Sequence, residues 1–272
     1  MQFHTTLKAI LETAEPAGKI GVFRRFYEAY RSGGTHFEKD YAPVTFDAPS
    51  FASVCTIVSP LDVPRRKNPG SREGQALLLH AIAHIEYSAI DLALDHAYRF
   101  TGLPRAFYDD WLEVADDECR HFEMLSALLE SLGYRYGDFP VHDGLFDAGQ
   151  RALTLLERMA VIPRYFEANG LDATPQILEK LSNIRGNPMI GRIADALKII
   201  LEEEVDHVRK GDRWFSYACE REGVDKSVYF DIIERSCPGS YPRKKYLNVD
   251  ARKAAGFSCG EISRMNPEAE CQ

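Results

Sequence analysis

The chain has few cysteines and no long apolar segment. Its 272 residues include six cysteines, spread along the chain without a CxxC pair. This spacing argues against a disulfide scaffold, a structural zinc site and an iron–sulfur cluster, so we expect a protein of the reducing cytoplasm. No apolar run approaches the ~20 residues of a transmembrane helix. Lys8 and Glu12 interrupt the N-terminal segment where an export signal would have an apolar core, so we expect neither an export signal nor membrane association.

The chain also lacks an excess of basic residues. It has 33 Lys and Arg against 41 Asp and Glu, which gives a formal net charge of −8. Proteins that bind nucleic acids generally, or anionic membranes, are normally basic, so we expect neither class. Arg65, Arg66 and Lys67 form a small basic cluster that we interpret as a solvated turn. The acidic excess is either a solvated surface or a group of carboxylates buried for a purpose.

Helical patterns dominate the sequence. Residues 5–13 and 17–32 predict two short helices, and five prolines between residues 36 and 70 then predict an irregular but ordered arm. Apolar residues recur at helical spacing over four longer segments, residues 71–101, 105–132, 146–169 and 189–222. A glycine closes each of these long segments, and a further short helix is predicted at residues 175–184.

The four long segments form two hairpins joined by a helix-free crossover at residues 134–143. This order is typical of an antiparallel four-helix bundle, so we predict an all-α protein. Residues 1–70 would be N-terminal helices and an arm packed on the bundle, residues 71–223 the bundle itself, and residues 224–272 a short helix and a tail. The tail mixes proline, glycine and charge without a period, and we expect it to be strapped over the bundle or partly loose.

Three of the long helices carry acidic residues and histidines on apolar faces. Glu86 lies on an apolar stripe of the first helix, where an isolated carboxylate would be too costly to bury. The second and fourth helices each carry a Glu-x-x-His motif, Glu118 with His121 and Glu204 with His207. Residues three apart share a helix face, so the carboxylate and the imidazole can reach one ion. Two motifs are weak evidence as a count, and their apolar context strengthens the prediction.

The remaining ligand should come from the third long helix, where Glu157 and Glu167 both have apolar neighbours. Glu86 precedes Glu118 by 32 residues, whereas Glu167 and Glu157 precede Glu204 by 37 and 47. A similar spacing in both hairpins favours Glu167. The intervening short helix could absorb the difference, so both residues remain candidates.

A glutamate plus a Glu-x-x-His motif, present twice, is the ligand set of di-iron and di-manganese carboxylate bundles. Carboxylates and imidazoles suit both metals and can bridge two ions. Four carboxylates carry a charge of −4, which two divalent ions would neutralise, so that the formal balance changes from −8 to −4. We therefore predict two Fe ions, or Mn ions. The alternative is a set of core ion pairs without metal.

Several neighbouring residues allow a simpler role beside a functional one. His84 lies about 200° around the helix from Glu86, so we expect it to pack against the protein rather than to reach the metals. Arg164 could balance the carboxylates or orient a substrate, and an ordinary ion pair is an equal alternative. Pro163 should kink the third helix.

A family resemblance rests on four stretches, HIEYSAIDLALD, DDECRHFEML with LGYRYGDFPVHDGLFD, RMAVIPRYFEANGLDATP and ILEEEVDHVRKGDRWF. They cover most of residues 71–215, and YLNVDARKAAGFS in the tail also fits. With these motifs the chain resembles the ferritin-like superfamily and, more narrowly, the bacterial family catalogued as domain of unknown function 455. The EANGLDATP stretch supports Glu167 over Glu157. The resemblance implies as metal ligands Glu86, Glu118, His121, Glu167, Glu204 and His207.

The expected reaction comes from superfamily analogy with tRNA-hydroxylating di-iron monooxygenases and rubrerythrins. We expect an O2- or peroxide-dependent oxidoreductase of the monooxygenase type, because the chain has no rubredoxin-type CxxC module. The expected partners are a small-molecule or modified-nucleoside substrate and an electron-donor protein, and the expected state is a monomer or dimer. The alternative function is non-catalytic metal binding or iron handling. The N-terminal arm and the tail argue against a ferritin cage.

Overall fold

The computed structural model describes residues 1–65, 67–242 and 246–271. The described residues are mostly helical, and their β structure is limited to two isolated bridges, Gln2 with His36 and Ile57 with Val141. The prediction of an all-α protein is therefore confirmed. The chain divides into two compact units, Met1–Phe146 and Asp147–Gln272. The predicted division into three segments remains a prediction.

The first unit begins with two short helices, α1 (Phe3–Leu11) and α2 (Pro16–Arg31). Glu15 caps α2 by accepting hydrogen bonds from the first free amides of that helix. The arm that follows contains the 3-10 turn η1 (Ser50–Ser53). Lys19 of α2 is fully buried and pairs with Asp91 of the long helix that comes next. This buried ion pair holds the N-terminal helices to the core of the unit. Arg66 of the basic cluster lies outside the described residues.

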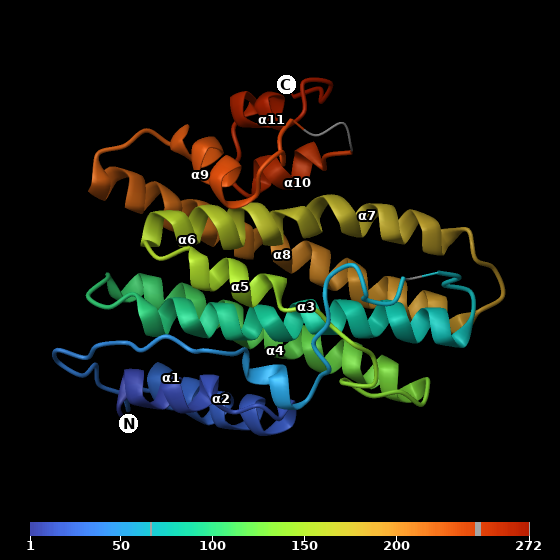
Figure 1. Cartoon of the computed structure of the whole chain (residues 1–272), viewed down its shortest axis with the longest axis horizontal. Helices are drawn as coiled ribbons and strands as arrows, with labels where there is room; N and C mark the ends of the chain where they lie inside the picture. The colour runs from blue at the N-terminus through green and yellow to red at the C-terminus, as the bar shows by residue number, and fades with distance from the viewer. Residues whose placement is uncertain (66, 243–245, 272) are drawn as a thin grey trace. The chain divides into compact units, whose positions relative to one another are not determined.

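That core is a hairpin of α3 (Arg72–Arg99) and α4 (Arg105–Ser131), which lie side by side in Figure 1. Ser71 caps α3 by accepting a hydrogen bond from the Gly74 amide at 3.1 Å, and Gly133 follows α4 with a φ of 78°. Both boundaries confirm the prediction. By length and composition α3 could cross a membrane, since its most apolar stretch has a mean hydropathy of 1.3. Because 78% of that stretch is buried inside the protein, it is typical of a core helix.

The second unit is built on α8 (Pro188–Glu222), a helix of 35 residues that ends at Gly223 in the left-handed conformation. Before it in the chain come α6 (Leu155–Val161), the π-helix η2 (Ile162–Glu167) and α7 (Ala168–Ser182), whereas α5 (Gly144–Arg151) begins in the first unit and ends in the second. The segments α6, η2 and α7 pack against α8 (Figure 1). The chain ends in α9 (Val228–Ser236), α10 (Val249–Ala254) and α11 (Cys259–Met265).

The predicted third long helix, residues 146–169, is wrong in its bounds. The chain leaves the helix after α5 and starts again where Thr154 and Glu157 form a capping box at the beginning of α6. Pro163 then lies in the π-helix η2, and the predicted kink at this residue stays a prediction. The region is therefore three consecutive segments.

The predicted helix end at Gly170 and the separate helix at residues 175–184 are also wrong, because α7 runs through both Gly170 and Pro175. Proline has no backbone N–H, so Pro175 leaves the carbonyl of Leu171 without its usual helical donor. The side-chain amide of Asn248 donates to that carbonyl at 3.2 Å. A distant part of the chain thus completes the helix.

The C-terminal segment is ordered over its described residues. Helix α10 packs on α7, α8 and α11, and a disulfide joins Cys259 at the start of α11 to Cys271. The spacing of the cysteines did not predict this bond, because 12 residues separate the two cysteines and no recognised pattern joins them.

Candidate metal centre

The first unit brings together Glu86 of α3 with Glu118 and His121 of α4. Their relative exposures are 4%, 0% and 0%, so all three side chains lie in the interior. The Nδ1 atom of His121 lies 3.2 Å from Oε2 of Glu86 and 3.5 Å from Oε2 of Glu118. Each residue offers one ligand atom within 4.8 Å of the others. These residues could hold a metal ion.

The electrostatics of this group favour a cation. Burial lowers the pKa of His121, but hydrogen bonds and charges from Glu118 and Glu86 outweigh it and raise that pKa to about 11. The protonated imidazole therefore supplies one positive charge beside two carboxylates. A metal ion bound through Nδ1 would replace this proton, because metal-bound histidine is neutral.

The second unit contains the other Glu-x-x-His motif on α8. Oε1 of Glu204 lies 3.7 Å from Nδ1 of His207, and the two side chains are 12% and 0% exposed. The corresponding atoms of Glu118 and His121 are 3.5 Å apart, and their side chains are fully buried. Both motifs therefore direct the histidine Nδ1 atom toward the carboxylate one helical turn earlier.

The two candidates for the remaining ligand occupy different environments. Glu157 belongs to the capping box of α6, where its Oε2 accepts a hydrogen bond from the Thr154 amide at 3.3 Å. The side chain of Glu157 therefore serves to start α6. Glu167 ends η2, which packs against α8, and its Oε2 atom is shielded from solvent. Glu157 therefore has a local structural role, and Glu167 stays the candidate ligand of this unit.

His84 has a structural role, as the sequence indicated. Its Nε2–H donates to the His142 carbonyl at 2.9 Å, and its Nδ1 accepts from the Tyr136 hydroxyl at 3.0 Å. The imidazole therefore ties α3 to the crossover that follows α4. At the surface of α4, Arg120 pairs with Asp117 at 2.5 Å, so this arginine makes an ordinary ion pair.

Sequence reasoning missed how closely η2 approaches α8. A Cβ atom added to Gly211 would lie 2.2 Å from Cβ of Pro163 and 2.5 Å from its Cγ. Gly211 lies one turn after His207, and Pro163 lies one turn before Glu167. A glycine inside a long helix was the available signal, since such a residue marks a close approach of another segment.

Comparison with known proteins places the chain in a family. The family model described as "Protein of unknown function (DUF455)" matches residues 12–263. A protein of Haemophilus influenzae described as "Uncharacterized protein" is 35% identical over 273 residues, which cover 96% of this chain and 92% of that protein. No solved structure matches the chain. The chain therefore belongs to the DUF455 family, as its sequence motifs indicated.

Proposed function

We propose that the protein is a ferritin-like, di-metal carboxylate oxidoreductase that uses O2 or peroxide in the cytoplasm. In this proposal α3, α4, the segment from α6 to α7, and α8 form an antiparallel four-helix bundle that encloses two iron ions or, alternatively, manganese ions. The observation that carries the proposal is the repeated geometry of Glu118 with His121 and of Glu204 with His207. The proposed ligands are Glu86, Glu118, His121, Glu167, Glu204 and His207.

The donor set fits such ions. Four carboxylates and two imidazoles are the ligands that iron and manganese bundles use, whereas thiolates would favour zinc or iron–sulfur clusters. In the first unit, Glu86 and Glu118 carry two negative charges in the interior and His121 supplies one positive charge. A divalent cation that replaces the His121 proton would match the charge of the two carboxylates.

Two such ions, when bound, supply electrons for the activation of O2 or peroxide. The protein itself binds the ions and shields them from water. The glutamates provide oxygen ligands, His121 and His207 provide Nδ1, and the apolar side chains of α3 and α4 around Glu118 exclude water. Exclusion of water strengthens the charge interactions within the site and protects reactive species from side reactions. A small molecule or modified nucleoside is the proposed substrate class, and an electron-donor protein is the proposed partner.

Metal analysis tests the proposal. After loading with Fe2+ or Mn2+ and removal of free metal, we expect two ions per chain in the wild type and a loss of stoichiometric binding in Glu118→Gln. Glu130→Gln is the matched control, because Glu130 is an exposed carboxylate on the same helix. Fewer than one bound ion per wild-type chain, or full occupancy in Glu118→Gln, would refute the metal assignment.

The oxidoreductase and the iron-handling alternative differ in their reaction with O2. Stopped-flow mixing of the Fe2+-loaded protein with O2 should give oxidation limited to the bound ions. Continued uptake of Fe2+ with accumulation of ferric mineral would favour iron handling over an enzyme.

A further inference from the structure

Residues 248–265, which contain α10 and α11 and are named here the C-terminal strap, hold the chain on both sides of Glu167. We propose that the strap positions this metal ligand, with Arg252 and Glu261 as its main positioning residues. The inference rests on the proposed function, because it takes Glu167 as a ligand.

The segment that carries Glu167 cannot complete its own backbone hydrogen bonds in the usual way. It contains a π-helix, an uncommon geometry, and two prolines that lack backbone donors. Groups from outside the segment donate hydrogen bonds to its backbone carbonyls. Asn248 of the strap donates to the Leu171 carbonyl at 3.2 Å, and the hydroxyl of Tyr229 in α9 donates to the Arg164 carbonyl at 3.0 Å.

Arg252 of the strap binds the chain directly after Glu167. Its fully buried guanidinium donates from Nη2 to the Ala168 carbonyl at 3.1 Å. The same guanidinium pairs with both carboxylate oxygens of Asp172, at 2.6 Å for Nη2 and Oδ2 and at 3.1 Å for Nε and Oδ1. The backbone amide of Asn248 also donates to Asp172, at 2.9 Å. A buried guanidinium with several charge-assisted hydrogen bonds has little freedom to move, so this end of the segment is fixed.

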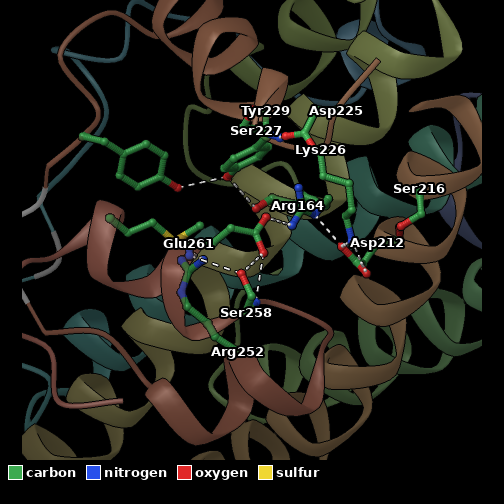
Figure 2. Close-up of polar contacts among 12 residues, drawn as sticks. Arg164, Asp212, Ser216, Asp225, Lys226, Ser227, Tyr229, Arg252, Ser258 and Glu261 are labelled. Atoms are coloured by element: carbon green, nitrogen blue, oxygen red, sulfur yellow. Dashed lines mark hydrogen bonds and ion pairs between the residues drawn. The ribbon is translucent and has the colours of Figure 1, made fainter. Parts of the chain in front are cut away.

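Glu261 of the strap holds the chain on the other side of Glu167. It does so through Arg164, which lies three residues before Glu167. Its Oε1 accepts a hydrogen bond from Nη2 of the fully buried Arg164 at 2.6 Å, and Nε of Arg164 lies 2.9 Å from Oδ1 of Asp212 in α8. Figure 2 shows Arg164 between these two carboxylates, with Ser258 bound to Glu261. Three aromatic rings surround the guanidinium, with their centroids within 4.7 Å of Cζ of Arg164: those of Phe215, Tyr229 and Phe257.

These contacts link the strap, η2 and α8 through one arginine. Burial raises the pKa of Glu261, but the Arg164 charge and the hydrogen bonds from Arg164 and Ser258 together outweigh it and lower that pKa, so Glu261 is ionised at neutral pH. Arg164 lies three residues before Glu167 and Ala168 immediately follows it. The strap therefore restrains the backbone that orients the Glu167 side chain. Partners of this kind, which orient a ligand without touching the metal, typically contribute 10–100-fold in metal affinity.

Titration with Co2+, which reports its coordination through visible absorption, tests the proposal. We expect the wild type to bind two ions. Glu261→Gln should bind one ion with wild-type affinity and the second roughly tenfold more weakly, with an altered absorption spectrum for that second ion. Asn248→Ala, which removes a single neutral side chain and is the milder change, should weaken the second ion in the same direction. Should Glu261→Gln fail to fold, this second variant decides the question.

Two controls separate positioning from loss of stability. Glu268→Gln removes the same charge from an exposed position after α11, and Leu181→Ala destabilises α7 at a buried site near its far end. Both should bind two Co2+ ions with the wild-type spectrum. Wild-type affinity and spectrum for both ions in Glu261→Gln and Asn248→Ala would overturn the positioning role.

The test also distinguishes this inference from the proposed function. If the wild type binds no Co2+, the proposed function fails. Amide hydrogen exchange of residues 164–172 then tests the restraint in the metal-free protein, where Glu261→Gln should accelerate exchange roughly tenfold relative to Glu268→Gln. Unchanged exchange would show that the strap does not hold the segment.

Discussion

Replacing Gly211 by alanine tests the packing that brings η2 against α8. The new Cβ atom would lie 2.2 Å from Cβ and 2.5 Å from Cγ of Pro163. Carbon atoms in contact normally lie ~3.5–4.0 Å apart, so the helices would have to separate by roughly 1.5 Å. The ring of Pro163 is buried and cannot rotate away as a flexible side chain would.

The expected loss of stability follows from two opposing effects. Overpacking of a well-packed interior typically costs 1–3 kcal/mol, and contact with two ring atoms places this case at about 3 kcal/mol. Alanine in a helix interior is more favourable than glycine by about 1 kcal/mol. We therefore expect Gly211→Ala to lower the free energy of unfolding by about 2 kcal/mol.

Urea unfolding followed by far-UV circular dichroism measures this change. The matched control is Gly191→Ala in the same helix, where an added Cβ would meet no atom within 4 Å. The control should raise the free energy of unfolding by about 0.5–1 kcal/mol, because only the helix-propensity effect remains. Equal effects of the two substitutions, or a Gly211→Ala protein at least as stable as the wild type, would refute the reasoning.

A double-mutant cycle locates the cause. Pro163→Gly removes both ring atoms that the new Cβ would meet, so Gly211→Ala should cost less in that background than in the wild type. The coupling free energy should be at least about 1 kcal/mol. If the effects of the two substitutions are additive, the loss of stability does not come from contact between the new Cβ atom and the Pro163 ring.

Three further predictions concern separate parts of the molecule. Burial and His84 lower the pKa of His80 from 6.5 to about 4, so His80 is neutral in the folded protein while the unfolded chain takes up a proton below about pH 6.5. His80 should therefore contribute about 2 kcal/mol to the loss of stability from pH 7 to pH 5, and the loss should be smaller by about that amount in His80→Gln. Lys19→Met leaves Asp91 without its buried counter-charge and should lower the free energy of unfolding by roughly 3 kcal/mol, whereas Lys19→Met with Asp91→Leu should recover most of this loss. Reduction of the Cys259–Cys271 disulfide should lower the local stability of α11 by up to about 3 kcal/mol, measured by amide exchange.

Each of these predictions has a contrary result. An equal acid sensitivity in His80→Gln would mean that another group causes it. A double variant at Lys19 and Asp91 that is no more stable than Lys19→Met would show that the unpaired charge is not the source of the loss. Unchanged exchange in α11 on adding a thiol reductant would mean that noncovalent contacts hold this helix.

The candidate ligands were predictable because their chemistry is local. Glu118 with His121 and Glu204 with His207 share a face by helical spacing alone, and in the structure they lie 3.5 and 3.7 Å apart. Glu157 and Glu167 could not be separated in this way, because both stand among apolar neighbours. Thr154-x-x-Glu157 matches the local capping-box pattern, and the structure shows that Glu157 caps α6.

The boundaries of the long helices were also set locally. Ser71 starts α3, Gly133 follows α4 and Gly223 ends α8, and each acts through the conformation or hydrogen bonds of its own few residues. The sequence by itself therefore determined the all-α class, the extents of these helices and the two Glu-x-x-His motifs.

Tertiary structure decided the rest, chiefly the course of the chain from η2 to α7. Pro175 and Gly170 both predict a break, yet the helix continues because Asn248 satisfies the Leu171 carbonyl across 77 residues of sequence. The same holds for Arg164, whose burial depends on carboxylates and rings that come from α8, α9 and the strap. Local propensity acts over one or two turns, whereas these contacts join residues whose proximity only the folded chain creates.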